Sequence, residues 1–126
     1  MMPAAINFAE QLARIDAPWS PRVVAELNDG IPLNRMFKLV KIQGDFVRHR
    51  HDDTDKAFLV QSGELHIEFR DATRTLGAGG MLLVPRVVEH RPHAQAECHV
   101  LPIEPRGTFD TRDAGGAMTA ADDVWI

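Results

Sequence analysis

The chain has 126 residues, of which 44% are hydrophobic and 25% are charged, and its formal net charge is -4. This length supports one hydrophobic core, so we predict a single domain over residues 1–126. The acidic balance argues against nucleic-acid binding, and the apolar runs are too short to cross a bilayer. Cys98 is the only cysteine, which excludes an internal disulfide and predicts a buried core thiol in a cytoplasmic protein.

The N-terminal part of the chain combines one helical stretch with several prolines. Residues 6–15 place apolar side chains at helical spacing, which predicts a short helix. Pro18, Pro21 and Pro32 then break the chain into extended pieces and turns. We therefore expect residues 1–30 to form an arm that packs on the domain or on a partner subunit.

From Asn34 onward the sequence alternates apolar and polar residues as β-strands do. The expected strands cover residues 35–43, 45–51, 57–61, 64–69, 81–85 and 96–105. Many short strands, separated by Gly, Asp or Pro, predict an all-β antiparallel sandwich or barrel. The polar tail over 107–126 ends in Val124, Trp125 and Ile126, which we expect to tie the chain end back to the body.

Three histidines suggest a metal site. His49 and His51 lie one residue apart on the strand predicted over 45–51, and side chains i and i+2 of a strand point to the same face. His90 follows about forty residues later, after a second apolar run. Two clustered imidazoles and a distant third are typical of a metal site that is assembled by folding.

The residues around these histidines resemble the two sequence motifs of the cupin superfamily. The first motif is matched by Gly44, His49, His51, Lys56 and Gly63, and the second by Gly79, Pro85, Val87, His90 and Ala94. The resemblance spans residues from about 38 to 105. Within the superfamily, the chain resembles a group of small single-domain cupins, some of them sugar-phosphate-isomerase-like. It implies a cupin jelly-roll β-barrel with its core at about 34–105. It also implies a homodimer, for which the arm before Asn34 and the residues 124–126 are the expected contacts.

Lys56 departs from the cupin pattern, which places a metal-binding glutamate at this position. An ammonium beside a divalent cation opposes metal binding if it points inward and stays protonated. Lys56 could instead lose its proton, or reach the barrel mouth and pair with Asp52, Asp53 or Asp55, or the site could hold no metal. Asp55 could replace the glutamate only if a bulge shifted the strand by one residue.

The remaining ligands still form a known type of centre. Thiol dioxygenases, which are also cupins, use three histidines without a carboxylate, and His49, His51 and His90 resemble that set. Imidazole ligands favour zinc, nickel or iron as the divalent ion. Lys56, Phe58 and Val60 share one face of their predicted strand, and by analogy with the motif this face lines the ligand pocket.

Two functions follow from these residues. The first is a small-molecule-binding cupin with a divalent metal at the three histidines, acting as a metal-dependent isomerase or oxygenase. The second is a non-catalytic, metal-free binding or sensing module that uses Lys56 to hold an anionic ligand. The resemblance does not choose between them, because cupins carry many unrelated activities.

Overall fold

The computed structural model describes residues 3–106 and 124–125. One short helix, α1 (Phe8–Leu12), precedes the strands. The strands are β1 (Arg22–Leu27), β2 (Arg35–Asp45), β3 (Lys56–Ser62), β4 (Leu65–Glu68), β5 (Thr73–Leu76), β6 (Met81–Val84) and β7 (Arg91–Glu104). The described part of the chain contains no helix long and apolar enough to span a membrane.

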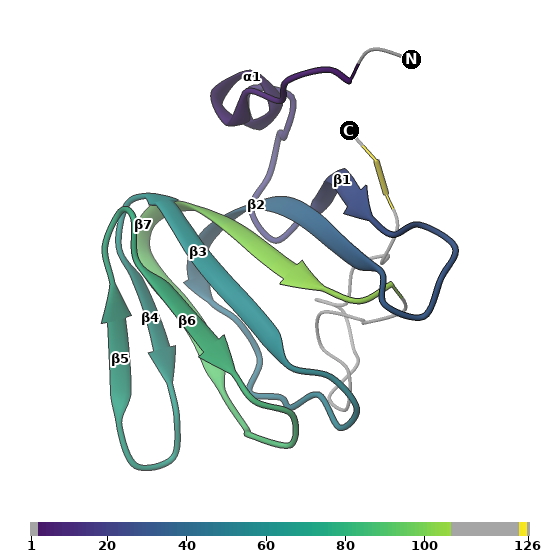
Figure 1. Cartoon of the computed structure of the whole chain (residues 1–126). Coiled ribbons are helices and arrows are strands. Elements are labelled where there is room, and N and C mark those ends of the chain that lie inside the picture. The colour runs from purple at the N-terminus through teal and green to yellow at the C-terminus, as the bar shows by residue number, and fades with distance from the viewer. Residues whose placement is uncertain (1–2, 107–123, 126) are drawn as a thin grey trace.

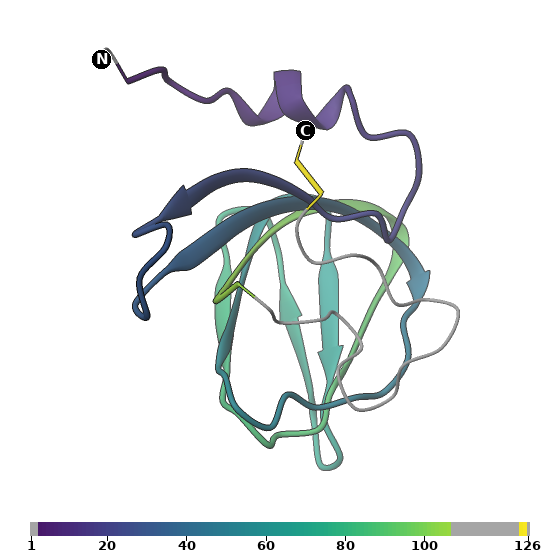
Figure 2. The ribbon, with the colours of Figure 1, turned by 90° about the vertical axis from the view of Figure 1, so that its right-hand side faces the viewer.

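All seven strands belong to one antiparallel sheet that curls into a jelly roll (Figures 1 and 2). The order along its main path is β1-β2-β7-β3-β6, and β4 adds a second branch by pairing with both β5 and β7. The long strand β7 therefore pairs with β2, β3 and β4. This arrangement confirms the all-β prediction.

The core forms because alternate residues of the strands face the interior. In β2, the inward row is Met36, Lys38, Val40 and Ile42, and each of these side chains is buried. The other strands contribute Phe58, Val60, Leu65, Ile67, Leu76, Val84, Ala94, Cys98 and Val100 to the same apolar cluster. Because Lys38 lies in this row, the interior also contains a buried charged side chain.

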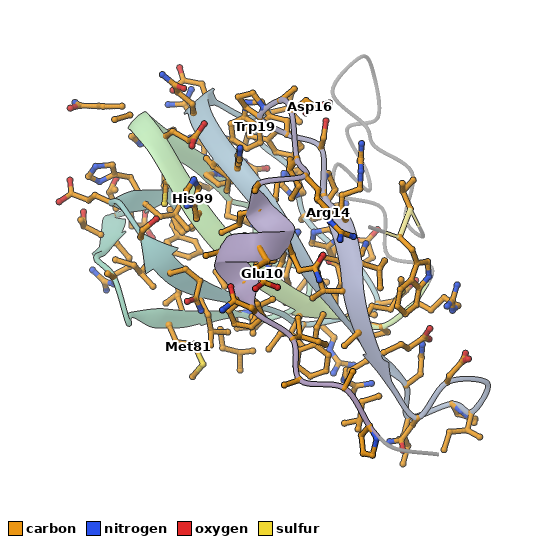
Figure 3. All side chains as sticks on the ribbon, turned by 90° about the horizontal axis from the view of Figure 1, so that it is seen from above. Glu10, Arg14, Asp16, Trp19, Met81 and His99 are labelled. Carbon is orange, nitrogen blue, oxygen red and sulfur yellow. The ribbon has the colours of Figure 1, made fainter. Side chains whose placement is uncertain are left out.

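The helical part of the arm packs on its own domain. Asn7 caps α1, because its side-chain oxygen accepts a hydrogen bond of 2.9 Å from the Glu10 amide. On the opposite side of α1, Leu12 joins Leu39 and Leu101 in a second apolar cluster on the outer face of the sheet. Figure 3 shows α1 lying across that face, with the exposed Glu10 directed away from it.

The prediction of an arm over residues 1–30 was wrong for its last part. Residues 22–27 form β1, which pairs with β2 from Arg22 opposite Leu39 to Leu27 opposite Arg35. The helix ends at Leu12, before Pro18, and the residues that follow Pro21 pair with β2. Further along, the Val23 amide donates a hydrogen bond of 2.7 Å to the Val124 carbonyl, and Trp125 forms a parallel bridge with Val23. The chain end is thus tied back as predicted at these two residues, while Ile126 and 107–123 lie outside the described residues.

A further correction concerns the strand predicted over 45–51. The strand β2 continues through Gly44 to Asp45, and residues 46–55 are irregular apart from one bridge at His49. Gly44 has a φ of +84° and lies where the register between β2 and β7 shifts. Glycine tolerates this conformation, so Gly44 forms a bulge within one long strand instead of a turn between two.

Gly63 provides a test of backbone constraint at the turn between β3 and β4. Its φ is +87°, and an added Cβ would lie 3.0 Å from the Cys98 Cα atom. We expect Gly63→Ala to lower the free energy of unfolding by about 2 kcal/mol, measured by chemical denaturation. Gly77→Ala is the matched control, because its added Cβ meets no described atom within 4 Å. Equal stabilities for the two variants would contradict this expectation.

Candidate metal centre

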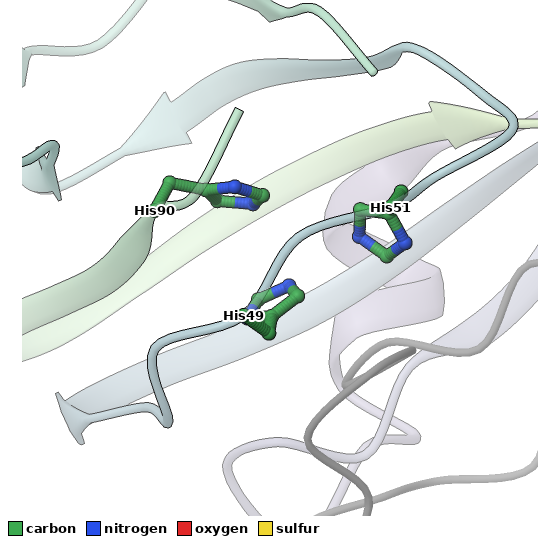
Figure 4. Close-up of side chains that lie close together, drawn as sticks. All are labelled: His49, His51 and His90. Atoms are coloured by element: carbon green, nitrogen blue, oxygen red, sulfur yellow. The ribbon is translucent and has the colours of Figure 1, made fainter. Parts of the chain in front are cut away.

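The three predicted histidines converge inside the barrel. His49, His51 and His90 are 2%, 3% and 0% exposed, and each offers one nitrogen within 4.8 Å of the others. The ring centroids lie 4.4 Å apart for His49 and His90, 5.0 Å for His49 and His51, and 5.8 Å for His51 and His90. Figure 4 shows the three rings gathered around a common space. These side chains are positioned to hold a metal.

A backbone bridge brings the first and third histidines together. The His49 amide donates to the His90 carbonyl at 2.9 Å, and the His90 amide donates to the His49 carbonyl at 2.8 Å. Residues paired in this way place their side chains on the same face of the two segments. Two histidines that are 41 positions apart in the sequence thereby become direct neighbours.

The ring orientations of His49 and His90 suit metal ligation. His49 Nδ1 lies 2.9 Å from the Val47 carbonyl oxygen, and His90 Nδ1 lies 3.0 Å from that of Val88. In a neutral ring, an Nδ1–H that donates to a carbonyl leaves the lone pair on Nε2, where a metal can bind. Both histidines use the carbonyl two residues earlier, and both stand in the sequence pattern Val-x-His.

His51 reaches the site by a different route from the one predicted. The segment that carries it is irregular, so strand alternation does not place its ring beside that of His49. The His51 carbonyl instead accepts a hydrogen bond of 2.7 Å from the Val87 amide, which connects this loop to the one before His90. Val87 has a φ of +62° in that loop. The expected convergence of the histidines is present, but loop packing produces it.

A cavity of about 40 Å³ lies beside His49, with room for about three water molecules, and neither His51 nor His90 lines it. Its polar lining consists of His49, Lys56 and Glu104, and the apolar residues are Trp19, Pro21, Val40, Ile42, Phe46, Phe58, Pro92 and Pro102. Lys56 and Phe58 line it, whereas Val60 does not and belongs to the main apolar cluster. Trp19 stacks on Phe46 with ring centroids 4.7 Å apart, so the N-terminal arm supplies part of the wall.

Lys56 faces inward and is paired with a carboxylate that the sequence did not single out. Its Nζ lies 3.5 Å from Glu104 Oε2, while Lys38 Nζ donates a hydrogen bond of 2.8 Å to Glu104 Oε1. All three side chains are at most 8% exposed. The inward position of Lys38 in the alternating row of β2 was the one available signal for this cluster. Glu104 sits outside the group of nitrogens that could share one ion.

Two of the three aspartates considered as partners of Lys56, Asp52 and Asp55, contact arginines instead. Asp55 accepts hydrogen bonds from the Arg86 backbone amide at 2.8 Å and from Arg86 Nε at 3.2 Å. These contacts hold the pKa of Asp55 below its usual value. Asp52 accepts a hydrogen bond from Arg50 Nε at 2.9 Å. Asp55 is therefore not a substitute for the missing glutamate ligand in this structure.

Cys98 behaves as a core residue, as the sequence predicts. It is fully buried in the main apolar cluster, and this desolvation raises the pKa of its thiol to about 11. Because the thiolate is the reactive form, we expect the native protein at pH 8 to react slowly with an aromatic disulfide reagent. Unfolding in denaturant should restore rapid reaction, and equal rates in the two states would contradict this assignment.

Comparison with known proteins places this geometry in a family. The cupin domain family matches residues 36–104. A crystal structure of a cupin-2 domain containing protein from Shewanella frigidimarina is 50% identical, with a TM-score of 0.75 over 80% of this chain and 94% of that one. The structure of protein NMB1881 from Neisseria meningitidis is 32% identical, with a TM-score of 0.69 over 81% of this chain and 99% of that one.

A curated relative is similar over a shorter stretch. The protein YdbB of Bacillus subtilis is 32% identical over 95 residues, which are 65% of this chain and 80% of that protein. The matched family segment begins in β2 and ends at Glu104 in β7, so it contains all three histidines. The chain is therefore a member of the cupin family.

Proposed function

We propose that this protein is a small-molecule-binding cupin that holds one divalent metal through His49, His51 and His90. The observation that carries the proposal is the convergence of three buried imidazoles, two of which have their Nδ1 atoms held by backbone carbonyls. Three neutral nitrogen ligands suit zinc, nickel or iron. A bound ion would act as a Lewis acid toward an oxygen of the ligand.

The cavity supports a small-molecule ligand with one reactive polar end. Apolar and aromatic walls surround three polar side chains, His49, Lys56 and Glu104. Sites of this composition orient a ligand by a few polar contacts and exclude water with the remaining surface. Its volume of about 40 Å³ admits only the reacting end of a larger molecule.

The proposal is tested by metal analysis of the full-length protein. After stripping with a chelator and reloading with zinc, nickel or ferrous iron under anaerobic conditions, we expect one ion per chain by mass spectrometry of the dialysed protein. Anomalous scattering from crystals should place that ion among the three rings. Protein that stays metal-free after loading would contradict the proposal.

The alternative of a metal-free anion-binding module is less well supported. In that alternative Lys56 would hold the anion, but its Nζ already lies 3.5 Å from the Glu104 carboxylate and 5.0 Å from the centre of the Phe58 ring. Lys56→Glu separates the two functions, because it restores a carboxylate at the family's ligand position. We expect tighter metal binding by calorimetry if the centre is a metal site. Unchanged metal affinity together with lost binding of a small carboxylate such as acetate would favour the alternative.

We further propose that the protein forms a homodimer through the β1–β2 hairpin, which projects beyond the barrel (Figure 2). Leu27, Ile31 and Leu33 are 55%, 52% and 68% exposed there. A second copy of the chain could cover this apolar tip in a two-fold arrangement. Light scattering should show a dimer for the wild type and a monomer for Leu33→Lys. Met81→Lys, on the distant edge strand β6, is the control, and a monomeric wild type would contradict the proposal.

A further inference from the structure

Three polar side chains on the outer face of the sheet are linked by hydrogen bonds. Ser62 Oγ lies 2.9 Å from His99 Nδ1, and His99 Nε2 lies 2.7 Å from Glu97 Oε2. Cys98 and Val100 belong to the apolar core, so His99, which lies between them on β7, faces outward. A hydroxyl, an imidazole and a carboxylate connected in this order can activate a serine as a nucleophile. Ser62 and His99 are 37 positions apart, so sequence spacing does not reveal the contact.

A bulge in β3 brings Ser62 to His99. Val60 pairs with Val100 of β7, and the register then shifts, so that Ser62 instead of Gln61 lies opposite His99. Val60 is buried in the core, and regular alternation from it would turn Ser62 inward as well. Bulges redirect side chains in this way and are common next to active sites. Ser62 is therefore exposed on the same face as the His99 ring.

The two hydrogen bonds determine which nitrogen of the ring carries the proton. An ionised carboxylate can only accept, and the hydrogen bond from His99 holds the pKa of Glu97 below its usual value. Glu97 therefore accepts from His99 Nε2–H. In a neutral ring, Nδ1 then carries a lone pair, and the Ser62 hydroxyl donates to it. This tautomer is the one that a general base needs in order to take the serine proton.

A groove of about 260 Å³ beside His99 has room for a small ester. It is lined by Ala9, Leu12, Ala13, Lys41 and His99. Figure 3 shows His99 beside α1 on this face. Lys41 lies opposite His99 in the sheet, and one of its three N–H groups donates to the Ile15 carbonyl at 2.7 Å. Its positive charge favours the negative charge that develops on a carbonyl oxygen under attack, and the small apolar side chains favour a short acyl group.

We propose that Ser62, His99 and Glu97 form an esterase centre that hydrolyses small uncharged esters with a short acyl group. Ser62 is the nucleophile, and His99 is the general base. Glu97 is a positioning residue, because it holds the ring and contacts no reacting atom. The esterase centre shares no residue with the three-histidine cluster, so it does not depend on the proposed metal function.

The proposed reaction conserves atoms and electrons. The Ser62 hydroxyl proton moves to His99 Nδ1 while Oγ bonds to the ester carbonyl carbon, whose π pair moves onto the carbonyl oxygen. When this pair returns, the bond to the alcohol oxygen breaks, and the alcohol leaves with the proton from His99. Water then attacks the acyl–serine with His99 again as the base, which releases the acid and restores the Ser62 hydroxyl. Water is the only co-reactant.

Covalent labelling tests the nucleophile directly. The full-length protein is treated with diisopropyl fluorophosphate, which forms an O–P bond with an activated serine and releases fluoride. Peptide mass spectrometry then locates the adduct. The chain contains two serines, Ser20 and Ser62, so Ser20 is an internal control. We expect one adduct per chain at Ser62 and its loss in His99→Ala, whereas no adduct, or equal labelling of the two serines, would overturn the proposal.

Hydrolysis of p-nitrophenyl acetate measures turnover. We expect release of p-nitrophenol to fall by about 100-fold in Ser62→Ala, the size typical of a lost proton-transfer pathway, while Ser20→Ala keeps the wild-type rate. Glu97→Gln should lower kcat with little change in KM, and Glu97→Asp should recover part of kcat, because a carboxylate again holds the ring. A folded Ser62→Ala protein that hydrolyses the ester at the wild-type rate would contradict the assignment.

Removal of metal separates the esterase centre from the proposed metal function. Chelator-treated protein should be labelled at Ser62 and should hydrolyse the ester as fast as metal-loaded protein. Hydrolysis that requires metal and persists in Ser62→Ala would overturn the esterase centre. A wild type that binds no metal but is labelled at Ser62 would overturn the metal function alone. If Ser62→Ala does not fold, labelling of the wild type decides.

Discussion

Replacement of His51 by alanine should weaken zinc or nickel binding by more than about 100-fold, because loss of a mere outer-shell partner already lowers metal affinity by 10- to 100-fold. His51 is one of three buried rings with nitrogens within 4.8 Å of each other. Two remaining imidazoles do not enclose an ion. Isothermal titration of the chelator-stripped variant against wild type measures the change.

The matched control for this experiment is another histidine outside the cluster. His99 lies on β7, where its ring contacts Ser62 Oγ at 2.9 Å and Glu97 Oε2 at 2.7 Å. His99→Ala should leave the metal affinity unchanged. If His51→Ala and His99→Ala bind metal equally well, the ion does not sit at the three converging rings. Circular dichroism should show a native β spectrum for both variants.

The second large effect is expected on stability. Glu104→Ala should lower the free energy of unfolding by about 3–5 kcal/mol, because it removes the carboxylate that faces two buried ammonium groups. Lys38 and Lys56 are 3% and 8% exposed at their side chains, so water compensates them poorly. Urea denaturation at neutral pH and fixed salt measures the loss.

A compensating variant distinguishes uncompensated charge from lost packing. Replacing all three members with apolar residues of similar size, as Lys38→Met, Lys56→Met and Glu104→Leu, should recover most of the stability lost in Glu104→Ala. If the triple variant is as unstable as Glu104→Ala, the uncompensated lysine charges are not the cause of the lost stability. A Glu104→Ala protein as stable as the wild type would contradict the burial of the cluster.

Several features of this protein follow from local sequence rules alone. Alternation in residues 35–43 and 57–61 identified β2 and β3, because a half-buried strand needs an apolar face with period 2. The same rule placed Lys56, Phe58 and Val60 on one face, and the resemblance to the cupin motif implied that this face is the inward one. The spacing of the histidines, together with the resemblance to cupins, predicted the members of the metal cluster.

Other features required contacts between distant segments. Residues 22–27 carry only a weak strand pattern after two prolines, and they became β1 because the edge of β2 offers unpaired backbone groups. Residues 45–51 alternate like a strand, yet the bulge at Gly44 and the loop packing around His51 override that pattern. Local periodicity cannot reveal either outcome, because each depends on a partner far away in the sequence.

By itself, the sequence determined which residues share a face of a strand and which imidazoles are candidates to share an ion, since side-chain alternation and ligand chemistry are local properties. The tertiary structure decided what surrounds them. The pairing of β7 with β2 and β3 sets Glu104 against Lys38 and Lys56, and the packing of the arm brings Trp19 to the cavity wall. Charge pairing and cavity shape depend on distances through space, which the order of residues along the chain does not contain.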